Sequence, residues 1–315
     1  MFLAAALWAG PACAQNVPAN ARLGWLAVGQ ATNTWTTFDE TLHRLGWIEG
    51  RNLVVDRRLA GEDADRYARA AADLVAARPD VIVGVGGRDV AALRAVTSTI
   101  PIVFVTVSDP VALGFAESLA RPGENVTGVS AMTPELELKQ LQLLRDLVPG
   151  ARRISMLRNS HSPGSDTRFA LDAAGVATLG VTLVRREADS AGDIDAAFAA
   201  AVADHDDAIH IEFYGTFLIE KTRIADLATR YRLPAVFGVS GFAEAGGLLS
   251  YGPDYEENYK HAAILVDKIL RGARPGDLPI EQPTTFKLVV NLKTAKVLGV
   301  TLPQSILFRA DETIE

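Results

Sequence analysis

Short runs of β-branched and aliphatic residues alternate with helix-length amphipathic segments from Arg22 to the end of the chain. Within residues 63–77, Tyr67, Ala71 and Leu74 share one face at the 3.6-residue period of a helix. Continuous apolar strands joined by helices are typical of parallel sheets covered on both faces, so the pattern predicts an α/β fold. The predicted strands are 23–28, 53–57, 81–85, 102–105, 126–129, 154–157, 181–185, 208–211, 235–237 and 248–250, and the predicted helices include 63–77, 134–147, 166–177, 220–231 and 255–271.

The chain is also long enough for two domains, because 315 residues exceed a typical single one. An apolar run follows Asp80, then a helix-length segment, then a second apolar run that begins at Pro101. The same order of run, helix and proline-initiated run recurs from Asp207 to Pro234. Two similar lobes would explain this repeat. The alternative explanation is that any two strand–helix–strand units have a similar order of elements. We therefore expect two Rossmann-like, doubly wound lobes joined by a hinge, with a cleft between them.

Breaks in the pattern at 126–134, 251–253 and 282–284 mark the expected chain crossings between the lobes. Lobe 1 is expected in residues 21–130, with 253–283 returning to it, and lobe 2 in residues 131–252. The last segment, 284–315, is placed with lobe 2, and the sequence leaves lobe 1 open as the alternative.

The first fourteen residues have the features of a signal peptide. They carry no charge, residues 2–9 are apolar, and Ala12-Cys13-Ala14 supplies a small-x-small cleavage pattern. The basic residues that usually begin such a peptide are missing, which points to a start further upstream. Lipidation of Cys13 is the alternative, and residues 10–12 match that motif poorly. Cleavage after Ala14 predicts a periplasmic protein without cysteine, hence without disulfides or thiol catalysis.

The net charge of −7 argues against a nucleic-acid partner, because phosphate binding needs a concentrated basic face. A small polar ligand fits better, since parallel sheets bind ligands beyond the carboxyl ends of their strands. Those positions are rich in Gly, Ser, Thr and Asn, with a few aromatic residues. The candidate ligand-binding residues are Gln30, Thr32, Asn33, Gly86, Gly87, Arg88, Ser108, Asp109, Asn159, His161, Ser162, Glu212, Tyr214, Ser240 and Tyr251.

Two of these positions have two interpretations each. The glycine-rich turn at Gly86 lacks the third glycine of a dinucleotide site, because Asp89 stands there, but it can still hold a carboxylate. Arg88 either pairs with the same anion or is a solvated residue of the first helical turn. Asp109, which precedes Pro110, either caps a helix or also accepts a hydrogen bond from a ligand ammonium group.

Catalytic and metal-binding patterns are weak. The histidines at 161, 205, 210 and 261 lack the spacing of metal ligands, and no GxSxG elbow is present. Glu212 and Glu244 are candidates for a carboxylate pair, but nothing in the sequence places them together. We therefore expect a binding protein with no catalytic residues, no metal and no cofactor.

Residues 45–53, LGWIEGRNL, resemble the LGYVEGRNL signature of a family of bacterial ABC-transporter substrate-binding proteins, the group that includes tryptophan- and tyrosine-type binding proteins. Further landmarks of that family follow in order over nearly the whole chain. They are STIPIVF at 98–104, DPV at 109–111, LARPGENVTG at 119–128, EAGGLLSYG at 244–252, VDKILRGARP at 266–275, LPIEQPT at 278–284, VNLKTAK at 290–296 and RADETIE at 309–315.

The resemblance implies a type I periplasmic-binding-protein fold. It also implies delivery of a small ligand, amino-acid-like or carboxylate-bearing, to permease and ATPase subunits of the inner membrane. We expect the protein to be a monomer. The resemblance implies that members close to the aromatic-amino-acid type bind ligand through loops matching 86–89, 108–110, 159–162 and the segment near 212–214. This chain departs there at Arg88, His161 and residues 212–215, which leaves its specificity open. A ligand-sensing module for a membrane receptor and an enzyme on the same scaffold are the alternatives.

Overall fold

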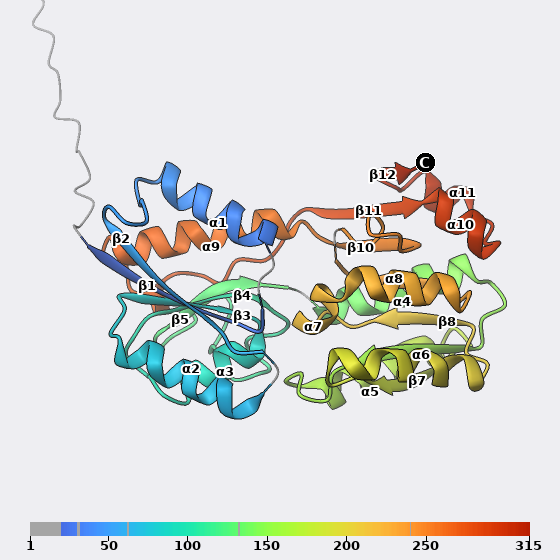
Figure 1. Ribbon diagram of the computed structural model, residues 1–315, viewed down its shortest axis with the longest axis horizontal. Coiled ribbons are helices and arrows are strands. Elements are labelled where there is room, and N and C mark those ends of the chain that lie inside the picture. Colours follow the sequence, from blue (N-terminus) through green and yellow to red (C-terminus); the bar gives the residue numbers. More distant parts are fainter. Residues whose placement is uncertain (1–19, 30–31, 62, 132, 240) are drawn as a thin grey trace, which may run out of the picture.

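The computed structural model describes residues 20–29, 32–61, 63–131, 133–239 and 241–315. The predicted signal peptide, residues 1–14, lies outside the described residues. Two α/β lobes lie side by side along the long axis of the molecule (Figure 1). The predicted class, α/β with two doubly wound lobes joined by a hinge, is confirmed.

Lobe 1 is built on a five-stranded parallel sheet with the order β2-β1-β3-β4-β5. Helices α1 and α9 pack together on one face, and α2 and α3 pack on the other. The side chain of Asp63 caps α2 by accepting a hydrogen bond from the amide of Arg66. The strands are Ala21–Ala27, Leu53–Leu59, Val81–Val85, Ile102–Val107 and Val126–Ser130, and the helices are Thr32–Arg44, Ala64–Ala76, Gly87–Arg94 and Tyr255–Leu270.

Lobe 2 has a seven-stranded sheet with the order β12-β11-β10-β9-β8-β6-β7. Helices α4 and α5 belong to one apolar cluster and α6 and α8 to another, so the core has two layers. The strands β6 to β12 are Arg153–Arg158, Thr182–Glu187, Ala208–Ile211, Ala235–Phe237, Leu249–Pro253, Phe286–Asn291 and Glu312–Ile314. The helices α4 to α8, α10 and α11 are Thr133–Leu147, Ser165–Ala177, Ile194–Ala203, Gly215–Ile219, Lys221–Arg230, Leu292–Leu298 and Gln304–Leu307, with a 3₁₀ turn at Ala191–Asp193. A second 3₁₀ turn, Pro275–Asp277, lies against β5 of lobe 1.

The chain passes between the lobes after β5, after β10 and before β11. Helix α9 packs on the lobe 1 sheet, and Glu281 still pairs with Val129 of β5, before β11 joins the lobe 2 sheet. Strand β10 therefore runs toward the hinge and β11 runs away from it, which makes this pair antiparallel. The apolar runs predicted parallel strands throughout. They carry no information on strand direction, which depends on where the chain crosses between the lobes.

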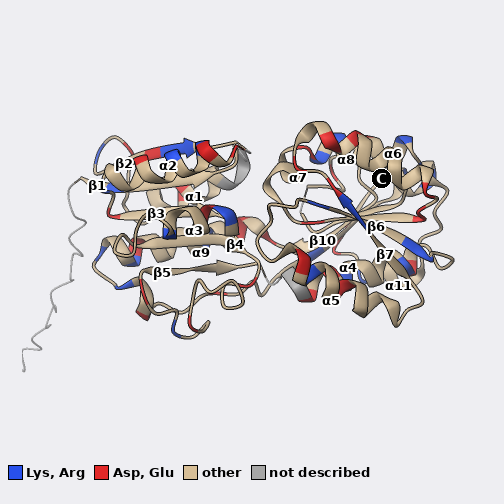
Figure 2. Cartoon of the chain, turned by 90° about the horizontal axis from the view of Figure 1, so that it is seen from below, with Lys and Arg blue, Asp and Glu red and all other residues tan. Residues whose placement is uncertain are grey.

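Charged residues of both signs are interspersed along both lobes (Figure 2). Within the described part of the chain, no helix combines the length and the apolar character that crossing a membrane requires.

Candidate functional site

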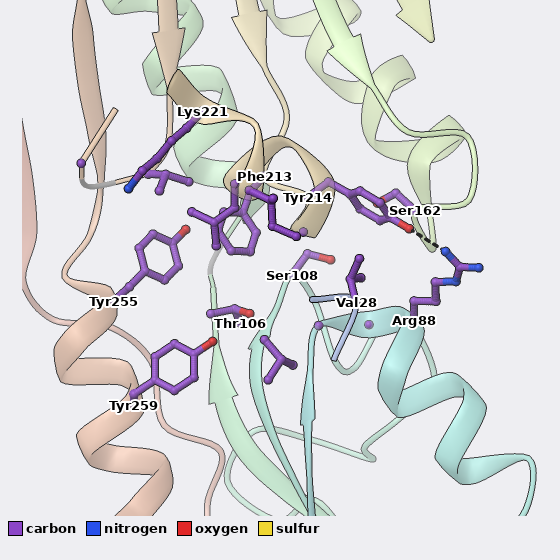
Figure 3. Close-up of a pocket in the computed structure, with 18 of the residues that line it drawn as sticks. Val28, Arg88, Thr106, Ser108, Ser162, Phe213, Tyr214, Lys221, Tyr255 and Tyr259 are labelled. Carbon is purple, nitrogen blue, oxygen red and sulfur yellow. Dashed lines mark hydrogen bonds between the residues drawn. The ribbon is translucent and has the colours of Figure 1, made fainter. Parts of the chain in front are cut away.

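A cavity of about 770 Å³ lies between the two lobes. Its wall is formed by residues that follow the carboxyl ends of strands from both sheets, as expected for open parallel sheets. Lobe 1 contributes Val28, Gly86, Gly87, Arg88, Thr106 and Ser108, and lobe 2 contributes Ser162, Pro163, Arg168, Phe213, Tyr214 and Gly215. Figure 3 shows these two walls facing each other across the cavity.

The part of the lobe 1 wall between β3 and α3 is formed largely by backbone. Gly86 has φ 106° and ψ 167°, a conformation that side chains essentially forbid, and it turns β3 directly into α3. The N-cap residue of α3, Gly86, has no side chain, and Gly86 and Gly87 both line the cavity, so the first turn of α3 offers its amide groups at this wall. This wall is suited to an anionic group such as a carboxylate.

Aromatic rings from both lobes form another side of the cavity: Phe213 belongs to lobe 2, and Tyr255 and Tyr259 belong to α9, which packs on the lobe 1 sheet. Phe213 follows β8 and stacks on Tyr255 of α9, with 4.9 Å between ring centroids and an interplanar angle of 7°. Tyr259 lies one turn further along α9 and also lines the cavity. These rings offer an apolar surface, with hydroxyl groups at two edges, for the body of a ligand (Figure 3).

A buried ion network supports the lobe 2 wall. Glu212 is fully buried and accepts hydrogen bonds from Arg158, from the Ser162 hydroxyl and from Arg168. Its second carboxylate oxygen accepts from the amide of Asn159, at 3.1 Å. A buried carboxylate is stable only when it is paired and hydrogen-bonded, so Glu212 holds the two arginines that surround it in place.

Three further titratable groups lie under the same wall. Burial raises the pKa of Glu137 well above its ordinary value, and it raises the pKa of Asp172 to about 6. Burial also lowers the pKa of His210 to about 3, and its Nε2 lies 2.6 Å from the Gln140 oxygen. The raised pKa of Glu137 favours its neutral form and His210 is a neutral imidazole, which limits the number of charges in this core.

Side-chain hydrogen bonds between described residues cross the cleft. Arg88 of lobe 1 donates to the Tyr214 hydroxyl of lobe 2 at 3.4 Å, drawn as a dashed line in Figure 3. Arg168 of lobe 2 donates to the Ser108 hydroxyl of lobe 1, also at 3.4 Å. Both contacts require the two lobes to be close together, so they form only in a closed arrangement.

The structure brings six of the predicted ligand-binding residues together at the cavity: Gly86, Gly87, Arg88, Ser108, Ser162 and Tyr214. Gln30 and Ser240 lie outside the described residues, and the side chains of Thr32 and Asn33, in the first turn of α1, are not described. Asp109, Asn159, His161, Glu212 and Tyr251 do not line the cavity.

These last five residues have other surroundings. Asp109 caps a turn by accepting from the amides of Val111 and Ala112, which is the capping interpretation of that residue. Asn159 accepts from the amide of His161, whose side chain is exposed. Tyr251 stacks on Phe286 in lobe 2, and Glu212 supports the wall from behind.

Sequence reasoning missed Thr106, Arg168, Tyr255 and Tyr259, and it included Phe213 only as part of the segment near 212–214. The spacing of Tyr255 and Tyr259, four residues apart on one helix, is a signal that would have found that pair. Arg168 gave no signal, because nothing local distinguishes it from other arginines in a first helical turn. The described residues contain no group of three or more His, Cys, Asp or Glu placed to hold a metal ion. The arrangement presents hydrogen-bonding groups and rings that bind a ligand.

Comparison with known proteins gives one family over most of the chain. A family model described as "ABC transporter substrate binding protein" matches residues 31–314. The tyrosine-binding protein of Clostridioides difficile strain R20291 is 24% identical over 264 residues, which cover 84% of this chain and 75% of that protein.

Two solved structures match almost end to end. The ABC domain from Streptococcus pneumoniae in complex with L-Trp is 25% identical, with a TM-score of 0.85, covering 94% of this chain and 100% of that one. A conserved domain protein from Vibrio cholerae O1 biovar El Tor strain N16961 is 28% identical, with a TM-score of 0.87, covering 93% of this chain and 99% of that one.

Proposed function

Because this chain belongs to the ABC transporter substrate binding protein family, we propose that it captures a small carboxylate-bearing solute of the amino-acid kind for an ABC importer. The fold is that of a type I periplasmic binding protein. The ligand enters the cleft, the lobes close over it, and the closed complex is delivered to permease and ATPase subunits.

The observation that carries this proposal is the cavity itself, with hydrogen bonds that join its two walls. Arg88–Tyr214 and Arg168–Ser108 each join one residue of lobe 1 to one of lobe 2. A ligand held by both walls favours the closed state by its differential affinity for that state. Binding and closure are therefore coupled, as a solute-binding component requires.

The chemistry of the walls favours a ligand with a carboxylate and an apolar body. The first turn of α3 and the Ser108 hydroxyl offer donors to the carboxylate, and Phe213 and Tyr255 offer ring faces to the body. Tyrosine and L-Trp, named for two of the similar proteins, fit this description. We propose an aromatic amino acid as the first ligand to test.

Export to the periplasm, through a signal peptide in residues 1–14, completes the proposal. A binding protein of an importer meets its solute on the outer side of the membrane, and the uncharged, apolar start of this sequence is suited to export.

Thermal unfolding with a ligand panel tests the proposal. L-Tyr, L-Trp and L-Phe, their carboxylate analogues and neutral sugars are added to the purified exported protein. A ligand at about 100 times its Kd adds roughly 2.7 kcal/mol, which raises the Tm of a chain of this size by about 4 °C. Ser108→Ala should reduce the ligand-induced rise, whereas Ser98→Ala, at an exposed position in the same lobe, should not.

Stabilisation by sugars alone would show that the proposed ligand class is wrong. A rise that is equal in wild type and Ser108→Ala would show that Ser108 does not contact the ligand.

A further inference from the structure

Thr106 has an unusual backbone for a buried residue. Its φ is +62°, it is 5% exposed, and it lines the cavity at the end of β4. The pairing of β4 with β5 shifts register between Val105 and Val107, so Thr106 is the bulged residue. A β-branched residue in the left-handed region is strained, and such residues persist where the surrounding structure and the function retain them.

The other non-glycine residues with positive φ in the described chain have ordinary explanations. All of them are exposed, and they lie at the chain start, in loops or just after helices, where the left-handed region is common: Asn20, Arg78, Glu124, His205 and Arg232. Thr106 differs from them in being buried, in a strand and in the cavity wall. Turn geometry therefore does not explain its conformation.

The bulge fixes what the Thr106 hydroxyl offers to a ligand. Its Oγ1 donates its one hydrogen to the Val105 carbonyl at 2.6 Å, and that carbonyl also accepts from the Gly86 amide. A threonine hydroxyl has one donor and two acceptor lone pairs, so the oxygen retains acceptor capacity. Figure 3 shows the Thr106 side chain facing the same space as Ser108 and Tyr259.

Ser108, two residues further along, has the opposite polarity. Its Oγ accepts a hydrogen bond from Arg168, at 3.4 Å, which orients its own hydrogen toward another acceptor. The two hydroxyls thus present an acceptor and a donor side by side at the end of one strand. A zwitterionic group, with an ammonium next to a carboxylate, matches this pair.

We propose that Thr106 is the residue that selects for an ammonium group: its hydroxyl oxygen accepts from the protonated α-amine while Ser108 donates to the carboxylate. This inference rests on the proposed amino-acid binding at the same cavity, and it adds a residue that discriminates an amino acid from the corresponding plain acid. The strained bulge is retained because it turns this hydroxyl into the cavity.

Binding calorimetry on the purified exported protein tests the inference with L-Trp and L-Tyr and with their deaminated analogues, indole-3-propionate and 3-(4-hydroxyphenyl)propionate. Thr106→Val keeps the shape and removes the hydroxyl. A hydrogen bond to a charged group contributes enough that we expect the affinity for both amino acids to fall by roughly 10- to 100-fold. The affinity for the deaminated acids should change by less than about threefold, because they lack the ammonium group.

Thr127→Val is the matched control. Thr127 is also a buried threonine of lobe 1, its hydroxyl donates to the Leu278 carbonyl, and it lies outside the cavity wall. It should leave the preference for amino acids over deaminated acids unchanged, as should Thr106→Ser, which keeps the hydroxyl. If Thr106→Val does not fold, Thr106→Ala takes its place in the same measurement, because it also lacks the hydroxyl.

Equal losses for amino acids and deaminated acids in Thr106→Val, or no loss for either, would overturn the role of Thr106 while leaving the proposed function intact. A wild type that binds the deaminated acids as tightly as the amino acids would also overturn it. If the wild type binds neither kind of probe, the proposed ligand class fails first and this inference fails with it.

Discussion

The two walls of the cavity are built in different ways. In lobe 1, the wall at the ends of β3 and β4 is backbone and small polar groups, beside the rings of α9: the turn at Gly86, the first turn of α3, and the hydroxyls of Thr106 and Ser108. In lobe 2, the wall rests on buried charges, with Glu212 between Arg158 and Arg168. The first wall depends on conformation and the second on electrostatic pairing, so the two should respond to different substitutions and conditions.

The difference shows how each lobe is kept rigid enough to close on a ligand. A glycine turn and a bulge fix the lobe 1 groups through the main chain, which side-chain substitutions elsewhere barely affect. The lobe 2 groups are fixed by long side chains, and these hold their positions only while every buried charge has its partner. We therefore expect the cavity-lining side chains of lobe 2 to lose their positions when one buried charge is removed or the pH changes.

The largest effect is expected from Glu212→Gln. This change leaves Arg158 and Arg168 buried without their carboxylate, which costs about 3–5 kcal/mol. Glu49→Gln in lobe 1 is the matched control, because the Arg57–Glu49 pair has side chains 34% and 41% exposed and contributes about 0–1 kcal/mol. Urea unfolding measures both. Equal costs for the two variants would show that the buried pairing of Glu212 does not support the lobe 2 wall.

Gly86→Ala tests the lobe 1 wall. A Cβ at this φ and ψ is strained whatever the free space, and the expected loss of unfolding free energy is about 1–3 kcal/mol. The α3 amides should also shift, so ligand affinity should fall. Gly150→Ala, at an exposed position with no atoms near the added Cβ, should be neutral or slightly stabilising. A Gly86→Ala variant as stable as Gly150→Ala would contradict a wall set by backbone conformation.

The smallest effect is a pH dependence confined to lobe 2. The pKa of His210 is lowered to about 3, so as pH falls the unfolded chain takes up this proton near its ordinary pKa of about 6.5 while the folded chain does not. Stability is therefore lost as pH falls, by about 1 kcal/mol between pH 8 and pH 6. Urea unfolding of His210→Gln at both pH values should lack this contribution.

The raised pKa of Asp172 acts in the opposite direction over the same range, since its stabilising protonated form is lost as pH rises through about 6. Wild type and His210→Gln share that contribution, so it cancels in their difference. His43→Gln, at an exposed position on α1, should follow the wild type at each pH. A wild-type to His210→Gln difference that stays constant from pH 8 to pH 6 would show that His210 is not kept neutral by burial.

Sequence patterns predicted the loops that meet at the cavity better than the residues that face it. The carboxyl ends of β3, β4, β6 and β8 were located from apolar runs, and each of them reaches the cavity. Glu212 and Asn159 come from such loops, yet their side chains turn back into lobe 2 to pair with Arg158 and the Ala188 carbonyl. Position in a loop is local information, whereas the direction of a side chain depends on its distant partners.

The sequence by itself determined the α/β class, the two-lobed organisation and the family, because apolar periodicity and ordered motifs are properties of contiguous residues. Tertiary structure alone decided which groups face the ligand. Arg168 reaches the cavity because Glu212, 44 residues away, holds it there. Thr106 presents its hydroxyl because β4 bulges against β5. Contacts between distant segments select one conformation among many that local sequence allows, and the binding wall consists of such contacts.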